Sequence, residues 1–414
     1  MLAPPEFSAG RRIGNREFVV LMAMLQALQA LAIDSMLPAL GVISHDLGVA
    51  DPNRRQLIVG LFLLFSGLFS LVPGAFADRF GRRPILFISL GGYVAMNLAA
   101  AFAPNFTTLL VFRCATGAFA AGFMVLTSAI IRDRFEGDRM ARTQSLVSMI
   151  FMIVPMAAPS LGQAIMLFAS WRWIFGGMAL LAVLVTTWAW LRIPETLHPE
   201  FRQPIQPAVI ARNMAKVLTT RAALGYVLAV ALVQGALFGY INSAQQLVAE
   251  HFGAGEAFPL VFGGMALFMA FTNLANSRIV ERFGARRVSH TAVVVYMVLG
   301  AVQLWLALSG SEDLWQFAPV MTLNLCAMSF IGSNFQAIAL QPFGRIAGAA
   351  ASVQVFMRLL GGAALGALIG QAYDGTAVPM AAALMVAGVG ALLLVLHAEH
   401  GRLFRRLHGQ VPQV

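Results

Sequence analysis

Long uncharged apolar runs constrain the fold of this chain more than any other feature. Residues 18–33 read FVVLMAMLQALQALAI, and similar runs of about 20 residues recur along the whole length. The 414 residues are 59% hydrophobic and 11% charged, whereas soluble domains are about half apolar and about a quarter charged. A helix of about 20 residues crosses the roughly 30 Å hydrocarbon core, and continuous apolar runs favour helices over barrel strands. The sequence therefore predicts an all-α membrane protein.

Twelve membrane-spanning helices fit the apolar runs. We place them near residues 18–42, 55–77, 85–103, 108–131, 143–168, 172–193, 222–247, 259–280, 289–309, 315–340, 347–372 and 378–398. The first run is too long for the apolar core of a cleaved signal peptide, so we expect it to remain as a helix. With the N-terminus in the cytoplasm, about 23 of the 28 Lys and Arg residues fall on the inner side. We therefore expect both termini in the cytoplasm, and the net charge of +10 needs no nucleic-acid partner.

An internal repeat divides the chain in two. The stretch ADRFGRR at 77–83 is echoed by VERFGARR at 280–287, at an offset of 203 residues that aligns Gly81 with Gly284. The longest hydrophilic stretch lies between the two halves and is rich in proline, which is typical of a linker. We predict six-helix halves at 1–193 and 222–414, joined by a cytoplasmic linker at 194–221. Parallel halves of this kind place a substrate site between them.

Three motifs resemble signatures of the major facilitator superfamily. They are GAFADRFGRRP at 74–84, FRCATGAFAAG at 112–122 and VPMAAPSLGQ at 154–163. The phrases IDSMLPAL, SWRWIF and IPETLHPE further resemble its bicyclomycin/chloramphenicol-resistance branch, Bcr/CflA. The resemblance implies the major facilitator fold, with twelve transmembrane helices in two pseudo-symmetric six-helix halves, and drug:proton antiport by alternating access. Arg358, in the eleventh predicted helix, departs from what the family leads us to expect.

Asp34 is the acidic residue that lies well inside a predicted helix, about 16 residues or roughly 24 Å from its start. A charge at such depth is costly, so ionisable residues there normally face a water-filled cavity. Burial favours the neutral carboxyl and a nearby cation favours the charged form, so a carboxylate between the two can load and release a proton. We predict that Asp34 is the proton-coupling site and that substrate competes with the proton. The alternative is a solvated carboxylate at a helix end that Pro38 marks.

Arg113 lies within the fourth predicted helix, and its guanidinium stays charged. The resemblance implies that the first and fourth helices both line the central cavity. We therefore predict that Arg113 is electrostatically coupled to Asp34 and tunes its proton affinity. The alternative is an arginine that extends its charged head to the outer membrane surface.

The loop after the second predicted helix holds candidates for gating. Gly81 permits a tight turn, and Asp78 can accept hydrogen bonds from a helix N-terminus. The resemblance implies that this terminus belongs to the eleventh helix and that a charge network closes the cytoplasmic side. The gating candidates are Gly74, Asp78, Gly81, Arg82 and Asp133. The alternative is a basic loop that only anchors the chain to the inner membrane surface.

The fifth predicted helix carries Pro155, Pro159 and Gly162 within eight residues. Proline kinks a helix, and small residues allow helices to approach closely. The resemblance implies a bend against the eighth helix that seals the cavity against proton leak, which favours antiport. The alternative is ordinary membrane-helix packing, in which glycine and proline are common.

Polar residues of the second half are candidates for the substrate cavity, because a lone amide in lipid is costly. The candidates are Gln234, Tyr240, Asn242, Gln245, Asn334 and Arg358. Arg358 can attract anionic or electron-rich substrate groups, or pair with polar groups of the eighth or tenth helix. The 21 Met and 31 Phe residues would suit a soft cavity for varied lipophilic substrates.

The motif search indicates neither an enzyme nor ATP-driven transport, since Walker A, HExxH and Gly-x-Ser-x-Gly are all missing from the sequence. We expect no cofactor and no metal site, because Cys114 and Cys326 lie in apolar runs without ligand spacing. The sequence predicts a monomeric, proton-coupled antiporter in the bilayer of the bacterial inner membrane that exports small lipophilic drugs or xenobiotics. Two alternatives remain: an exporter of an endogenous sugar, amino acid or siderophore, and a non-transporting sensor with the same fold.

Overall fold

The computed structural model describes residues 13–404 except 136, 198, 199, 201, 203–206 and 311. These residues form helices joined by turns and contain no strand. Contacts between residues divide the chain into two compact units, Met1–Pro207 with Gly255–Ala266 and Ala208–Ala254 with Leu267–Val414.

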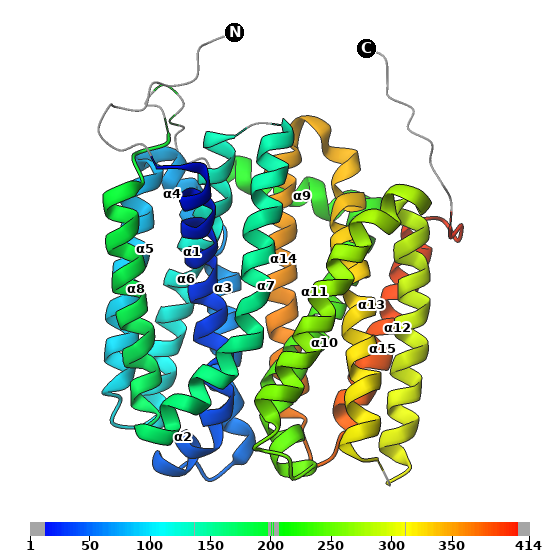
Figure 1. The fold of residues 1–414 in the computed structure, drawn as a ribbon. Helices are drawn as coiled ribbons and strands as arrows, with labels where there is room; N and C mark the ends of the chain where they lie inside the picture. Colours follow the sequence, from blue (N-terminus) through cyan, green and yellow to red (C-terminus); the bar gives the residue numbers. More distant parts are fainter. Residues whose placement is uncertain are drawn as a thin grey trace. The chain divides into compact units, whose positions relative to one another are not determined.

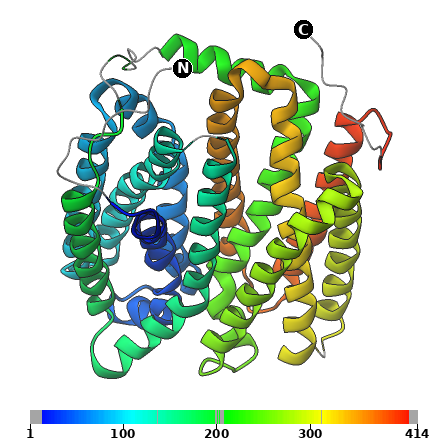
Figure 2. The same ribbon diagram turned by 45° about the horizontal axis from the view of Figure 1, so that its top comes forward.

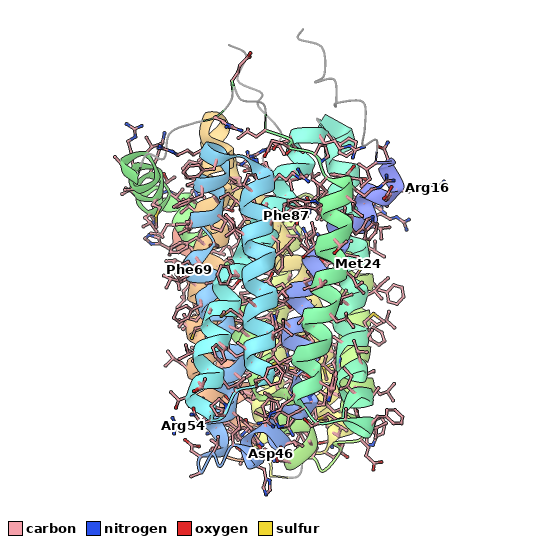
Figure 3. The ribbon with its side chains drawn as sticks, turned by 90° about the vertical axis from the view of Figure 1, so that its left-hand side faces the viewer. Arg16, Met24, Asp46, Arg54, Phe69 and Phe87 are labelled. Atoms are coloured by element: carbon pink, nitrogen blue, oxygen red, sulfur yellow. The ribbon has the colours of Figure 1, made fainter. Side chains whose placement is uncertain are left out.

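The first unit is a bundle of long helices, coloured blue to green in Figure 1. Its elements are α1 (Asn15–Asp34), η1 (Leu37–Ala39), α2 (Leu40–Asp46), η2 (Pro52–Gln56), α3 (Leu57–Phe69), α4 (Val72–Phe80), α5 (Arg82–Ala101), α6 (Phe106–Arg134), α7 (Gly137–Phe168) and α8 (Arg172–Arg192). Figure 3 shows Arg16 at one end of this unit, Asp46 and Arg54 at the other end, and Met24 and Phe87 between them. Charged ends around an apolar middle are what a membrane-spanning bundle requires.

The second unit continues from green to red in Figure 1. Its elements are α9 (Pro207–Thr219), α10 (Arg221–Gln245), the π-helical turn η4 (Gln246–His251), α11 (Phe258–Phe283), α12 (Ala285–Leu308), α13 (Leu314–Leu340), η5 (Gln341–Ile346), α14 (Ala347–Gln371) and α15 (Val378–Ala398). The start of α11 belongs to the first unit.

The predicted membrane spans all have a helical counterpart. In the described residues, ten helices are long and apolar enough to cross a membrane. The bent pair Asn53–Phe69 and Val72–Phe80 and the apolar part of α7, Ile153–Phe168, correspond to the two remaining predicted spans. The prediction of an all-α membrane protein is confirmed, with ten helices that pass as spans and an eleventh if the bent pair counts as one.

Two features of the helices differ from the prediction. The segment predicted as one helix at 55–77 is bent by 45° between α3 and α4, because Pro73 in the first turn of α4 has no N–H to donate to the carbonyl of Phe69. The predicted linker contains a helix, α9, which the sequence analysis did not place. The apolar positions of α9 recur at helical spacing, as in Ile210, Met214 and Val217, although prolines precede the helix.

The same helix pairs are in contact in the two units. In the first unit α1 packs against α7, and α5 packs against α6 and α8. In the second unit α10 packs against α14, and α12 packs against α13 and α15. The internal sequence repeat is therefore a repeat of structure.

The first membrane-spanning helix of each unit, α1 or α10, is its most buried span. Figure 2 shows α1, in dark blue, surrounded by the cyan and green helices of the first unit. From Ala27 to Asp34 every residue of α1 is buried, and most of α10 is buried as well. A polar side chain on either helix must therefore find its partners inside the protein.

Candidate functional site

Asp34 lies where the first membrane span breaks. The sequence predicted one helix over 18–42, but α1 ends at Asp34 and the chain continues through η1 and α2. Pro38 explains the break, because it has no N–H to donate to the carbonyl of Asp34 four residues earlier. Asp34 is only 5% exposed, so it is not the solvated helix-end carboxylate that was the alternative.

Arg113 caps the broken end of α1. It is fully buried in α6, and its Nη2 atom donates to the carbonyl of Ala32 at 3.0 Å. In a continuous helix Met36 would donate to Ala32, but the N–H of Met36 turns to the carbonyl of Ile33 at 3.4 Å. Unsatisfied carbonyls and the helix dipole both favour a cation at a helix C-terminus. Arg113 thus replaces a hydrogen bond that the break removes.

The remaining contacts of Arg113 come from α3. Its Nε atom donates to the carbonyl of Ile58 at 2.9 Å, and its Cζ atom lies 4.4 Å from the centre of the Phe62 ring. Among the described residues no ion pair joins Arg113 to Asp34, and Arg113 contacts the backbone of Ala32, two residues before Asp34. The predicted electrostatic coupling of Arg113 to Asp34 stays a prediction. Full burial excludes the alternative of an arginine at the membrane surface.

Helix α7 packs directly on the break in α1. A Cβ atom on Gly162 would overlap the carbonyl oxygen of Ser35, the residue after Asp34. Pro155 and Pro159 lie inside α7, which stays one helix. In the same unit, a Cβ on Gly263 at the start of α11 would come within 2.9 Å of a backbone carbonyl of α7. The motif of the fifth predicted helix therefore lies against the residue next to Asp34.

Two further polar side chains position α1, and the sequence analysis did not select them. Tyr93 of α5 donates its hydroxyl hydrogen to the carbonyl of Leu28 at 2.9 Å. Gln29 donates to the hydroxyl of Ser66 in α3 at 3.0 Å. All four residues are buried, so these bonds are formed away from water, where unpaired polar groups are costly. No sequence motif marks these residues, since each is one polar side chain in an apolar run.

Three of the predicted gating residues, Asp78, Arg82 and Asp133, form an ion cluster at one end of the first unit. Arg82 pairs with Asp78 at 2.6 Å and with Asp133 at 2.9 Å. Gly81 has φ +105°, a backbone conformation that side chains disfavour. A Cβ on Gly74 would meet Val125 at an ordinary 3.7 Å, so packing alone does not require glycine there. The predicted contact of Asp78 with the eleventh helix joins the separate units and stays a prediction.

Glu195 completes this cluster and was missed. Its carboxylate accepts from the backbone N–H groups of Arg82 at 2.8 Å and Arg83 at 3.1 Å, at the N-terminus of α5. The adjacent hydroxyl of Thr196 donates to Asp133 at 3.1 Å. An anion at a helix N-terminus is favoured by the helix dipole. The signal was present in the phrase IPETLHPE, which the sequence analysis used only for resemblance.

The second unit has its own buried polar network at the corresponding end. Arg286 pairs with Glu399 at 2.8 Å, and Tyr226 donates to the same carboxylate oxygen at 2.7 Å. Burial raises the pKa of Glu399, but the hydrogen bonds from Arg286 and Tyr226 more than offset burial and hold that pKa below its usual range. His290 lies 2.9 Å from Tyr226 and accepts from the N–H of Phe404 at 3.0 Å. This network ties the end of the chain to α10 and α12.

Among the predicted cavity residues, the structure brings Gln234 and Arg358 together. The Nη1 atom of Arg358 on α14 donates to Oε1 of Gln234 on α10 at 3.4 Å. A Cβ on Gly362 would lie only 3.0 Å from Gln234, so the two helices are close here. One expectation was that Arg358 pairs with polar groups of the eighth or tenth predicted helix. Among the described residues it forms no hydrogen bond with either helix.

The other predicted cavity residues are spread over the second unit. Asn334 of α13 donates to Asn276 of α11 at 2.9 Å. Tyr240 is buried on α10, and both amide atoms of the buried Asn242 are without a hydrogen-bond partner among the described residues. Gln245 lies at the end of α10, and its buried Oε1 atom also has no hydrogen-bond partner among the described residues. No group of three His, Cys, Asp or Glu side chains that could hold a metal ion occurs in the described residues.

Comparison with known sequences gives a family match over most of the chain. Residues 22–367 match the model of the Major Facilitator Superfamily. The chain is 30% identical to the bicyclomycin resistance protein homolog of Haemophilus influenzae, over 88% of this chain and 91% of that protein. It is 26% identical to a chloramphenicol resistance protein of Pseudomonas aeruginosa, over 84% of this chain and 82% of that protein.

Comparison with solved structures agrees on the fold. The crystal structure of a D-xylose-proton symporter superposes with a TM-score of 0.70 at 14% sequence identity, covering 92% of this chain and 95% of that chain. At this sequence identity, the similarity supports a shared fold and nothing further.

Proposed function

This chain belongs to the major facilitator superfamily and is therefore a multi-pass membrane transporter of small molecules and not an enzyme, and we propose that it is a proton-coupled antiporter that exports lipophilic drugs or xenobiotics. Its relatives include proteins named for resistance to bicyclomycin and chloramphenicol. The proposed location is the bacterial inner membrane, with both termini in the cytoplasm and the protein as a monomer. The excess of Lys and Arg on one side of the predicted topology supports that orientation.

The observation that carries the proposal is the burial of Asp34 at a break in the most buried helix of its unit. An acidic side chain inside a membrane protein that lacks a paired cation is stable when it binds a proton and costly when it is charged. Asp34 loads a proton from the outer side, and substrate binding from the inner side favours its release. One site that proton and substrate occupy in turn couples the two flows.

Arg113 and Gly162 serve this exchange by fixing the backbone on each side of Asp34. Arg113 holds the carbonyl of Ala32, and Gly162 lets α7 lie against Ser35. A movement of α7 would therefore act directly on the position of the carboxylate. The cluster around Arg82 is proposed to close the cytoplasmic side and to break when the transporter opens inward.

The test is proton movement in everted membrane vesicles with an imposed pH gradient. Antiport predicts that chloramphenicol, or another compound selected by a resistance screen in a strain without its own drug pumps, dissipates the gradient. Asp34→Asn should abolish the response, and Asp51→Asn, which alters an exposed carboxylate in a loop, should leave it unchanged. A symporter would carry the compound with the proton, an exporter of metabolites would respond to sugars or amino acids only, and a sensor would give no flux. Any of these three results would overturn the proposal.

A further inference from the structure

A small cavity inside the second unit holds a group of polar side chains. It is lined by Tyr226, Gln336, Gln354 and Arg358 together with four apolar side chains of α10 and α13. Gln354 precedes Arg358 by one turn of α14, so the two lie on the same face. Gln354 is 5% exposed, and its Nε2 atom is buried without a hydrogen-bond partner among the described residues. An unused amide donor thus lies beside a guanidinium.

Among the described residues, no ion pair involves the guanidinium of Arg358. Its hydrogen bond among the described residues goes to the neutral amide of Gln234, at a long 3.4 Å. The three helices that line the cavity, α10, α13 and α14, contain no Asp or Glu. Tyr226 leads to one carboxylate, that of Glu399, which is already paired with Arg286 at 2.8 Å. A guanidinium stays charged and offers five donors, so this one has unused capacity for an anion.

The fully buried Arg113 shows what a structural role requires. Arg113 donates to two backbone carbonyls at 2.9 and 3.0 Å and lies on an aromatic ring. These contacts give its Nε and Nη2 atoms protein partners without any ligand, and its Nη1 atom is buried without a hydrogen-bond partner among the described residues. Arg358 has neither carbonyl partners nor a ring contact among the described residues.

We propose that this cavity, the Arg358 pocket, binds the carboxylate of an amphiphilic anionic substrate. The guanidinium forms paired hydrogen bonds with the carboxylate oxygens, and the Nε2 atom of Gln354 supplies a further donor. The apolar side chains contact the first carbons next to the carboxylate, while the body of the substrate lies outside the small cavity. The inference rests on the proposed export function and makes organic anions favoured over cations among its substrates, because an uncompensated positive charge repels cations.

The negative charge of the substrate has one energetic consequence. An anion that leaves the cell moves toward the positive side of the membrane potential, so the potential assists its export as well as the entry of the proton. Export of a cation by the same exchange would lose that advantage.

The test is a binding comparison with three probes that share one ring system: 1-naphthaleneacetate, its methyl ester, and 1-naphthylmethylammonium. Binding to the purified full-length protein in detergent is measured by calorimetry, without any proton gradient. The wild-type protein should bind the carboxylate at least tenfold more tightly than the ester or the cation. Arg358→Gln should remove this preference, and Arg358→Lys should keep part of it. Arg278→Gln, which removes the same charge from an exposed position of α11, should leave the preference intact.

Gln354→Met provides a second variant in case Arg358→Gln does not fold, and it should weaken carboxylate binding several-fold. Equal affinity of the wild-type protein for all three probes, or tighter binding of the cation, would overturn the inference whatever the variants do. Because the measurement needs neither Asp34 nor a gradient, a failed antiport assay with intact carboxylate preference would refute the proposed function alone. A successful antiport assay without any preference for the carboxylate would refute only the Arg358 pocket.

Discussion

Arg113 acts on the backbone of α1, and this changes what its substitution should do. Sequence analysis treated the residue as a charge that tunes Asp34, whereas the structure uses its fork of donors to hold the carbonyls of Ala32 and Ile58. An arginine can reach two carbonyls at once because its donors lie in a rigid plane. The shape of the side chain therefore matters as much as its charge.

Arg113→Gln should destabilise the protein by about 1–3 kcal/mol, the usual cost of leaving a buried hydrogen-bonding group without its partner. The thermal unfolding midpoint in detergent should fall by several degrees. Arg79→Gln removes the same charge from an exposed position of α4 and should leave the midpoint within about 1 °C. Equal midpoints for the two variants would show that Arg113 does not support α1.

Glu312, in the loop between α12 and α13, gives the molecule a pH-dependent stability. Burial raises its pKa to about 7, the hydrogen bond from Gln303 partly opposes this, and the neighbouring charge of Asp313 adds to it. The pKa in the folded state thus lies above the value of 4.5 for an unperturbed glutamate, so the folded state binds more protons between pH 4.5 and 7. Stability contributed by the protonated form is lost as the pH rises through that window.

The unfolding midpoint of the wild-type protein should fall by a few degrees between pH 5 and pH 8. Chain length sets how many degrees the midpoint moves for a given change in stability. Glu312→Gln cannot ionise and should show a smaller fall over the same range. Parallel curves for the two proteins would mean that Glu312 does not titrate in this window.

Glycines on the matching helices α7 and α14 allow close packing against α1 and α10. Gly162 of α7 leaves room for the backbone of Ser35, the residue after α1, and Gly366 of α14 leaves room for the backbone at Phe238 in α10. These two contacts lie about 204 residues apart in sequence, close to the offset of 203 found in the repeat around Gly81. The repeat therefore extends from the loop motif to the packing at the centre of each unit.

Gly162→Ala should lower the unfolding midpoint, because its Cβ would overlap a backbone carbonyl that cannot move without disturbing Asp34. Overpacking of this kind costs about 1–3 kcal/mol. Gly91→Ala is the matched control, since a Cβ at Gly91 in α5 meets no atom within 4 Å. If Gly162→Ala is as stable as Gly91→Ala, the close packing of α7 on α1 is wrong.

The sequence sufficed for the helices and failed where two distant segments meet. Runs of apolar residues define spans almost by themselves, because the membrane requires about 20 apolar residues per helix. The breaks at Asp34 and near Pro73 were also encoded locally, in prolines, and could have been predicted. The roles of Tyr93 and Glu195 could not, because each depends on a partner more than 60 residues away. A single sequence carries no signal for such pairs.

For the whole molecule, the central expectation is its orientation in the membrane. The cluster around Arg82 lies at one end of the first unit, and the loop before η2 lies at the other. The positive-inside rule places the Arg82 end in the cytoplasm.

Two single-cysteine variants, made after replacing Cys114 and Cys326, test this orientation with a maleimide that does not cross membranes. Ala50→Cys lies at an exposed position at the outer end and should be labelled in intact cells. Arg79→Cys, also exposed, should be labelled only in everted vesicles. The opposite pattern would invert the topology.

The most direct measurement of the central claim is proton release when substrate binds. Purified protein is kept in weakly buffered detergent solution at the pH where half of the molecules carry a proton on Asp34. A saturating amount of an exported compound is then added, and a pH-indicator dye reports the protons that are released. The account predicts a release of up to one proton per wild-type molecule and none from Asp34→Asn that still binds the compound. Undiminished proton release from Asp34→Asn would contradict it.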